Sequence, residues 1–437
     1  MTHQNPRTRR EFLRDSAVLA SSLVWMPSMR RTLPLNGRLR LASIGVGGMG
    51  SADLGEFLGH PNVDVVALCD IDAGRLSAAA KRAPKARTFV DYREMLAKMG
   101  DQIDAVNVAT PDHTHAPASM SAIQLGKHVY CQKPLTHDVY EARQLRLAAE
   151  KQKVVTQMGI QIHSHSAYRT AVKTIRAGVI GKVREVHSWS GKRWGYEGEK
   201  PKASKVPAGV AWDQWIGTAP MRPYARGHYH PGNWRRWVDF GCGTMGDMGI
   251  HILDPVAGAI DMGLPTSIMS YSPLGPPEDS HGMKNKVEYR FDGTRYTEPG
   301  FKLTWYDGGM FPDKTDWPIQ QLPGQGSMFV GEDAWMLLPH IGSPRLFGTY
   351  KEIYIAEEPG ANHYHLWVDA CLGEGKTSAG FDYAGPLSEV LALGVIANRF
   401  PTQRLDFDAE KLAITNFGDA DRLLRRKYRK GWEVEGL

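Results

Sequence analysis

The chain has 437 residues, of which 42% are hydrophobic and 23% charged, which fits a globular protein with two domains. Residues 1–40 hold eight Arg and two acidic residues, so the net charge of +6 belongs to this segment, and the 45 basic and 45 acidic side chains of the remainder cancel. This balance excludes a broad basic surface on the folded part, and we expect no nucleic-acid partner.

The first 38 residues predict an export signal. Residues 8–14 have the twin-arginine pattern Thr-Arg-Arg-Glu-Phe-Leu-Arg, and a modest apolar stretch follows over residues 16–26. A membrane span needs about 20 apolar residues, so this stretch is too short, and we expect no span. We expect a periplasmic or otherwise exported protein that uses the twin-arginine route. A disordered basic tail is the alternative.

Residues 40–50, Arg-Leu-Ala-Ser-Ile-Gly-Val-Gly-Gly-Met-Gly, predict a dinucleotide-binding turn. An apolar strand pattern runs into G-x-G-x-x-G, whose glycines allow a tight turn, close approach of a pyrophosphate and close helix–strand packing. The N–H groups of the next helix then face the phosphates. A glycine-rich turn without a ligand is the alternative. The residues expected to contact the cofactor are Gly45, Gly47, Gly48, Met49 and Gly50.

A carboxylate after the strand pattern at 63–68 indicates the kind of dinucleotide. Asp70 lies 20 residues beyond Gly50, where it can accept hydrogen bonds from the ribose hydroxyls of NAD. Asp72 is near and no basic cluster follows the strand, which favours NAD over NADP, although Arg75 leaves some room for NADP.

Strand and helix patterns alternate as far as residue 158. Alternation of this kind predicts βαβ units on a parallel sheet with helices on both faces, here a Rossmann domain over residues 39–160. Asp91 is expected to cap one of the helices. The predicted strands after the first two are 87–90, 103–109, 128–130 and 154–158, and the helices are 52–58, 73–82, 92–98, 117–125 and 139–151.

Two polar motifs fall at the carboxyl ends of these strands, where open parallel sheets bind their ligands. In residues 109–115, Ala-Thr-Pro-Asp-His-Thr-His, we expect Thr110, Pro111 and His115 to contact the cofactor; a purely structural loop is the alternative. Lys133 stands between a strand and Pro134, whose ring restricts the backbone before it, and this places Lys133 at the cofactor site.

The glycine turn, Asp70, Ala-Thr-Pro followed by His, and residues 126–129 (Gly-Lys-His-Val) running into Lys133-Pro134 resemble the Gfo/Idh/MocA family. This family contains glucose–fructose oxidoreductases, inositol dehydrogenases and their relatives. The resemblance extends over nearly the whole chain after residue 38. It implies an NAD(P)-dependent oxidoreductase with a catalytic Lys133. The family hallmark is Glu-Lys-Pro, and Gln132 replaces the Glu, which removes a charge beside Lys133.

The alternating residues 159–165, Gly-Ile-Gln-Ile-His-Ser-His, predict an extended segment with Gln161 and His163 on one side. The resemblance implies that this segment runs beside the nicotinamide, so we expect both residues to contact the substrate. A structural role for His163 is the alternative.

Residues 189–240 contain six of the twelve Trp. Aromatic faces beside hydrogen-bonding groups suit a sugar ring, although most of these Trp are expected only to pack the segment. We expect Tyr229, His230 and Arg235 to contact the substrate.

Residues 241–254 predict a catalytic pair. A glycine-rich loop enters a helix near Thr244, so Asp247 and His251 stand at i and i+4 on one helix face. A carboxylate there can fix the imidazole tautomer and produce a general base near neutral pH. The resemblance implies that these two are the catalytic Asp and His.

Short strand patterns from residue 265 to 346 predict a mostly antiparallel open sheet with helices on one face. Residues 161–437 are therefore expected to form an α+β domain for substrate binding and oligomerisation, whose closing helices can pack back on the first domain. The resemblance implies a homo-oligomer, a dimer or tetramer. The predicted strands are 267–271, 286–291, 300–305, 328–330 and 335–338; helices are predicted at 363–372 and 385–399, with a solvated closing helix over 422–430.

The four cysteines are widely spaced, so we expect buried free thiols, and nothing has the spacing of a metal site. They are Cys69, Cys131, Cys242 and Cys371.

Three functions are compatible with these residues. The first is transfer of hydride between a tightly held NAD and a carbohydrate or polyol hydroxyl, with His251 as base, Asp247 orienting it and Lys133 bonded to the oxygen. The second is an NAD-dependent glycosidase or lyase that cleaves a glycoside through transient ring oxidation and elimination, with Tyr229 or His230 as an additional base. The third is a non-catalytic binding protein.

Overall fold

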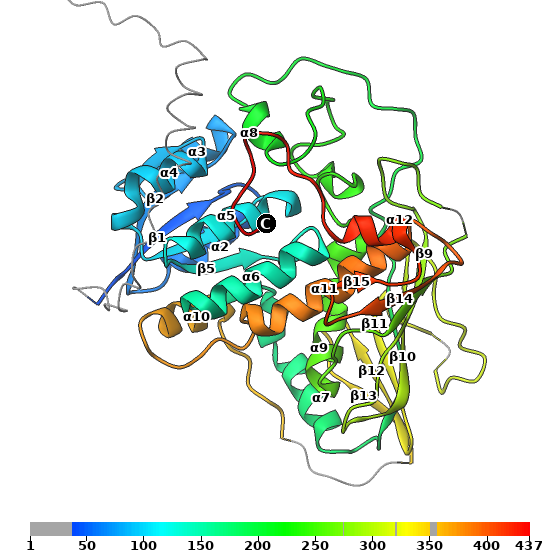
Figure 1. Ribbon diagram of the computed structural model, residues 1–437. Coiled ribbons are helices and arrows are strands. Elements are labelled where there is room, and N and C mark those ends of the chain that lie inside the picture. Colours follow the sequence, from blue (N-terminus) through cyan, green and yellow to red (C-terminus); the bar gives the residue numbers. More distant parts are fainter. Residues whose placement is uncertain (1–36, 274, 320, 350–355) are drawn as a thin grey trace, which may run out of the picture. The chain divides into compact units, whose positions relative to one another are not determined.

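The computed structural model describes residues 37–273, 275–319, 321–349 and 356–437 (Figure 1). The predicted twin-arginine pattern lies outside the described residues. Within them, no helix is long and apolar enough to cross a membrane.

Six strands form a parallel sheet in the order β3-β2-β1-β4-β5-β6, the strand order of a doubly wound Rossmann domain. Both faces of the sheet are covered, because Leu41 and Ala42, neighbours in β1, belong to two different clusters of buried apolar residues. This confirms the predicted Rossmann sheet. The strands are β1 Leu39–Ile44, β2 Val63–Cys69, β3 Arg87–Phe89, β4 Ala105–Val108, β5 His128–Gln132 and β6 Thr156–Gly159.

Three of the helices between these strands, α3, α4 and α6, begin at an aspartate whose side chain caps the helix. Asp91 caps α4 as predicted, because its side chain accepts a hydrogen bond from the Arg93 N–H. The first turn of α5, which begins at Asp112, escaped prediction because its residues are polar and Pro117 resembles a helix start. The helices are α2 Met49–Leu58, α3 Ala73–Arg82, α4 Tyr92–Met99, α5 Asp112–Gln124 and α6 Val139–Gln152.

The second sheet has nine strands in the order β13-β12-β11-β7-β10-β9-β8-β14-β15. Its neighbours pair antiparallel except β7 and β10, which confirms the predicted mostly antiparallel sheet. The strands are β7 Val183–Ser190, β8 Ser267–Ser270, β9 Asn285–Arg290, β10 Thr297–Asp307, β11 Gln325–Gly331, β12 Ala334–Pro339, β13 Arg345–Gly348, β14 Arg404–Asp408 and β15 Ala413–Ile414.

Helix α9 lies against β7 and β11 of this sheet, with α7 beside it, and α11 packs along α6 of the first domain (Figure 1). The last contact is reinforced by a pair between Arg143 of α6 and Glu389 of α11, 2.7 Å apart and largely buried. The helices are α7 Ser166–Arg176, α8 Trp212–Ile216, α9 Ile250–Ile260, α10 His363–Cys371, α11 Phe381–Ala397 and α12 Gly418–Asp421.

The basic run 422–430 is not the solvated helix that its charge pattern predicts. Only residues 422–424 form a 3₁₀ turn, and Arg426 is mostly buried, with its guanidinium 2.7 Å from the buried Glu141 of α6. Tyr428 donates to the same carboxylate at 2.6 Å. A buried guanidinium needs such partners, so this segment is tied to the first domain.

Replacing Arg426 by glutamine is expected to destabilise the protein by about 3–5 kcal/mol, because the Glu141 carboxylate is then left buried without its cation. The measurement is the urea midpoint at pH 7. Arg422→Gln is the matched control, since its pair with Asp419 is exposed and exposed pairs contribute about 0–1 kcal/mol. Equal midpoints for the two variants would contradict the structural role of Arg426.

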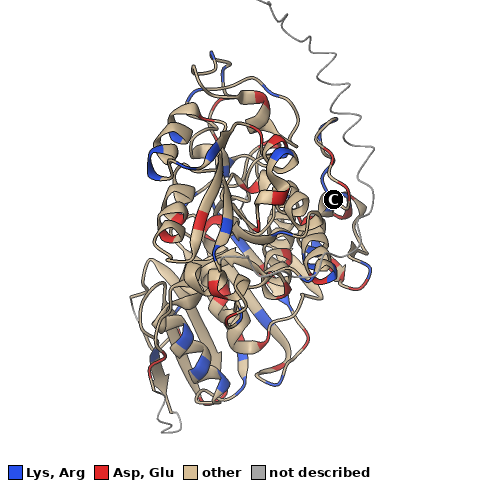
Figure 2. Cartoon of the chain, turned by 90° about the vertical axis from the view of Figure 1, so that its left-hand side faces the viewer, with Lys and Arg blue, Asp and Glu red and all other residues tan. Residues whose placement is uncertain are grey.

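Lys and Arg alternate with Asp and Glu over the helices and loops of both domains (Figure 2). The four cysteines are all buried and none forms a disulfide, as predicted. No group of three or more His, Cys, Asp or Glu that could hold a metal occurs among the described residues.

Candidate active site

The glycine turn after β1 is a cradle in which side chains do not fit. Gly45 has φ +80°, and a Cβ there would lie 2.6 Å from the Ala109 carbonyl oxygen. A Cβ on Gly50 would lie 2.0 Å from the Gly45 carbonyl oxygen, so helix and strand pack as closely as the motif predicts. Gly48, with φ +53°, faces open space, and the exposed Met49 follows it.

The same turn fits a dinucleotide. Helix α2 begins here with no side-chain cap. The N–H groups of Gly50 and Ser51 donate to the Gly47 and Gly48 carbonyls, whereas those of Gly48 and Met49 have no acceptor among the described residues and can bind a phosphate. The atoms nearest to a Cβ on Gly47 belong to the flexible side chain of Arg75. Asp70, at the end of β2, accepts hydrogen bonds from the N–H groups of Val46 and Asp72 at 2.8 and 2.9 Å, which fixes its carboxylate beside the turn.

Thr110 and Pro111 lie where β4 ends and α5 begins, at the same edge of the sheet. His115, also predicted to contact the cofactor, is buried, with its ring nitrogens against backbone carbonyls. Its Nδ1 lies 2.7 Å from the Pro134 carbonyl and its Nε2 2.8 Å from the Thr110 carbonyl. Burial lowers the pKa of His115 to about 4, so the neutral ring donates to one of these two carbonyls.

Lys133, just beyond β5, meets the second domain at Asp247. Its Nζ donates to the Asp247 carbonyl at 2.8 Å and to the Asp247 carboxylate at 3.0 Å. The cofactor edge of the first domain and the segment that bears His251 therefore meet in one site. Asp247 also supplies the negative charge beside Lys133 that Gln132 does not carry.

Asp247 is the centre of a larger group of donors. Arg235 Nε and the Trp194 indole nitrogen donate to its carboxylate at 3.2 and 2.7 Å, and Lys192 Nζ lies 3.6 Å away. Burial alone would raise the pKa of Asp247, but the charges of Lys133, Arg235 and Lys192 outweigh it and hold this pKa below its ordinary value. Arg235 was predicted for this site; Trp194 and Lys192 were not.

Asp247 lies in a π-helical turn, Met245–Gly249, that continues into α9. The glycines explain the tight packing of this turn, since a Cβ on Gly246 would lie 2.4 Å from the Cys242 Cβ. The loop before it is held by Asp112 of α5, which accepts from the Cys242 N–H at 3.0 Å.

The predicted bond between Asp247 and His251 is not formed. The carboxylate turns to the cations instead, because opposite charges attract it more strongly than a neutral ring, and the buried His251 Nδ1 has no partner among the described residues. Burial, followed by the charge of Lys133, holds the pKa of His251 well below its ordinary value. Its nearest ring is His340, with centroids 5.8 Å apart.

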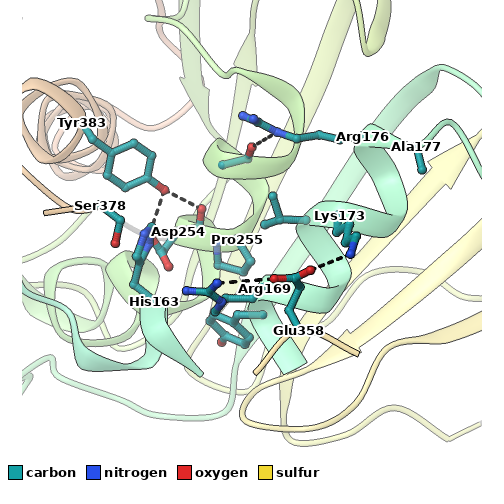
Figure 3. Close-up of a pocket in the computed structure, with 13 residues that line it drawn as sticks. His163, Arg169, Lys173, Arg176, Ala177, Asp254, Pro255, Glu358, Ser378 and Tyr383 are labelled. Atoms are coloured by element: carbon teal, nitrogen blue, oxygen red, sulfur yellow. Dashed lines mark hydrogen bonds and ion pairs between the residues drawn. The ribbon is translucent and has the colours of Figure 1, made fainter. Parts of the chain in front are cut away.

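The segment after β6 is not extended, so the expected alignment of Gln161 and His163 is wrong. Residues 161–164 form a 3₁₀ turn that leads into α7. His163 Nδ1 lies 2.8 Å from the buried Asp254 carboxylate, to which the Tyr383 hydroxyl also donates (Figure 3). These three line a cavity of about 670 Å³ beside α7; of the described residues, its walls do not include Lys133, Asp247 or His251.

Two further predicted substrate residues lie elsewhere. Tyr229 is buried among the rings of Trp212, Trp237 and Phe240, so it packs the aromatic segment. His230 Nε2 lies 3.2 Å from the carboxylate of Asp72, at the ribose end of the cofactor edge. The packing of aromatic rings holds Tyr229, and the polar contact with Asp72 holds His230.

Two family profiles match this chain. One, described as oxidoreductase family, NAD-binding Rossmann fold, matches residues 39–160, and the other, described as oxidoreductase family, C-terminal alpha/beta domain, matches residues 167–297. Together they cover more than half of the sequence. The chain belongs to the Gfo/Idh/MocA oxidoreductase family. Its first domain is an NAD-binding Rossmann domain.

Curated relatives of this Gfo/Idh/MocA protein match in part. An inositol 2-dehydrogenase of Corynebacterium glutamicum is 29% identical over 147 residues, which are 33% of this chain and 43% of the relative. A glycosyl hydrolase family 109 protein of Stenotrophomonas maltophilia is 38% identical over 137 residues, 28% of this chain and 29% of the relative. The chain thus spans less than half the length of these relatives.

Solved structures share the fold over most of the chain. The WlbA dehydrogenase of Chromobacterium violaceum, in complex with NADH and UDP-GlcNAcA, has a TM-score of 0.65 at 17% identity and covers 87% of this chain and 99% of its own. The aldose-aldose oxidoreductase of Caulobacter crescentus, complexed with glycerol, has a TM-score of 0.58 at 16% identity, with coverages of 85% and 100%.

At the position where the Gfo/Idh/MocA hallmark has Glu, Gln132 donates to both carboxylate oxygens of Asp53 in α2, each at 3.0 Å. Burial raises the pKa of Asp53 to about 7, against the hydrogen bonds from Gln132 and Tyr364. Gln132 of β5 therefore binds an acidic group on α2. Gln132 is thereby held in place directly before Lys133.

Proposed function

We propose that this protein transfers hydride between a tightly held NAD and a CH–OH group of a carbohydrate or polyol, with His251 as the general base. The observation that carries the proposal is the contact between Lys133 and Asp247, because it joins the carboxyl end of β5 to the helix that bears His251. The relatives named for inositol and aldoses support this substrate class.

NAD, when bound, supplies the hydride acceptor. The side chains of this chain handle the proton and the charge. His251, uncharged because of its lowered pKa, is ready to take the hydroxyl proton of the substrate. The Lys133 ammonium donates to the same oxygen and stabilises its developing negative charge. Asp247 holds Lys133 and Arg235 in position. This role differs from the predicted one, in which Asp247 would orient His251.

Contacts over the end of β2 support tight retention of the cofactor. The Ala73 N–H donates to the Gly209 carbonyl and the Ala211 N–H to the Ile71 carbonyl, both at 2.9 Å. Residues of the second domain therefore lie across the ribose end of the Rossmann edge. We also propose that the protein is exported by the twin-arginine route. Tight retention of NAD matters there because export leaves the free nicotinamide pool behind. We further propose that the protein assembles as a dimer or tetramer.

A second candidate is redox-assisted glycoside cleavage, for which the glycosyl hydrolase family 109 relative is one support. Elimination needs an additional base. Tyr229 and His230 do not lie at this site, but His340 faces His251, and burial with the charges of Lys192 and Lys133 lowers the pKa of His340 to about 4. Cleavage of a glycoside without net change in bound NAD is the result that favours this candidate.

The proposed function is tested by denaturing the dialysed protein and identifying the released nucleotide by mass spectrometry. We expect close to one NAD per chain. The NAD-loaded protein is then mixed with sugars, polyols and glycosides while absorbance at 340 nm is followed. Absence of bound nucleotide together with no uptake of added NAD would overturn the proposal.

A further inference from the structure

The site around Asp247 carries more positive than negative charge. Lys133, Lys192 and Arg235 all lie within 3.6 Å of this one carboxylate. The carboxylate accepts three hydrogen bonds, from Lys133, Arg235 and the Trp194 indole, so most of its acceptor positions are already used. Asp112 is another acidic group near these cations, and burial raises its pKa to about 7, which leaves it a weak counter-charge at neutral pH.

Two of the cations keep donors for a ligand. Arg235 uses Nε for Asp247 and Nη1 for the Gly232 carbonyl, and its Nη2 has no acceptor among the described residues. The guanidinium lies over the Trp234 ring at 4.1 Å, which fixes its plane. Lys192 is about half exposed and lies beyond hydrogen-bond distance of Asp247 at 3.6 Å. The excess charge also faces the buried His251, whose Nδ1 has no partner in the described part of the chain.

We propose that the carbohydrate bound at this site carries a carboxylate, which Lys192 and Arg235 bind beside Asp247. This inference rests on the proposed function and narrows its substrate class to acidic sugars. Arg recognises a carboxylate through paired N–H donors, and the compact Lys ammonium adds a point charge. The added negative charge offsets the cations that hold down the pKa of His251, so the base becomes stronger when this substrate is bound.

The test compares matched acids and neutral sugars on NAD-loaded protein. Dissociation constants are measured by calorimetry for D-glucuronate against D-glucose and D-galacturonate against D-galactose, with D-glucose 6-phosphate as the phosphate arm. We expect at least one uronate to bind about tenfold or more tightly than its neutral partner, as one charge-assisted hydrogen bond gives. Neutral sugars that bind as tightly as their uronates in both pairs, no binding by either uronate, or a stronger preference for the phosphate overturns the inference.

Lys192→Met is expected to remove this preference for the uronate. Lys98→Met is the control, because Lys98 has a similar exposed fraction, 56% against 50%, and is also paired with a carboxylate. A preference that survives in Lys192→Met overturns the inference. If only neutral sugars reduce the bound NAD, the proposed function stands and this inference fails. If a uronate binds tightly but no sugar changes the absorbance at 340 nm, the proposed function fails and this inference stands.

Discussion

Replacing Asp247 by asparagine is expected to lower kcat by about 10²–10³-fold, because preorganised charge at the reacting oxygen is lost. The amide carries no charge to hold Lys133 and Arg235. Its NH₂ group is itself a donor and cannot accept the hydrogen bonds that the carboxylate now receives from Lys133, Arg235 and Trp194. The measurement is the rate of absorbance change at 340 nm with the substrate that the panel identifies, together with the amount of NAD released by denaturation, which is expected to stay unchanged.

Asp261→Asn is the matched control for this variant. Asp261 ends α9, the helix that Asp247 precedes, and is likewise paired with arginines, Arg176 and Arg295, but it is exposed. Asparagine tolerates its left-handed backbone, so folding and activity are expected to stay close to those of the parent protein. If Asp247→Asn and Asp261→Asn had the same kcat, Asp247 would have no role in the reaction.

Replacing His251 by glutamine is expected to lower kcat by about 10²–10⁴-fold, since glutamine keeps a hydrogen-bonding side chain but cannot take a proton. His60→Gln, at a histidine paired with Asp369 at 3.0 Å, is the control and is expected to retain the parent kcat. The comparison is made at saturating substrate, so that it reports kcat.

The pH dependence of the parent protein provides a second readout of His251. Its pKa lies well below the ordinary value of 6.5, so the free protein carries the neutral, active form of the base at neutral pH. We expect kcat/KM to be level from pH 8 to pH 6.5 and to fall only below that range. A fall that begins above pH 6.5, or an unchanged kcat in His251→Gln, would argue against His251 as the base.

The Rossmann domain was predictable because its signals are local. Apolar runs end in turns, Asp91 caps its helix, and the spacing of Gly45, Gly47 and Gly50 encodes a close approach that the structure shows directly. Such features depend on neighbours within a few residues. The alternating strands of the second domain were predictable for the same reason, although the short strands β13, β14 and β15 carry too little pattern.

The errors concern residues whose roles depend on distant partners. Asp247 and His251 have the spacing of a bonded pair, yet three cations from remote segments decide where the carboxylate points. Arg426 belongs to a basic run, but its guanidinium pairs with the buried Glu141 and is largely removed from solvent. Sequence spacing records which residues share a helix face and does not record which charge the fold brings opposite them.

The proposed reaction requires the nicotinamide ring to lie between Lys133 and His251. A crystal structure of the protein with NAD would show this position. We expect the pyrophosphate on the turn from Gly45 to Gly50, a ribose on Asp70, and the nicotinamide C4 facing the space that Lys133 Nζ and the His251 ring share. A nicotinamide bound away from either side chain, for example in the cavity beside α7 lined by His163, would contradict it.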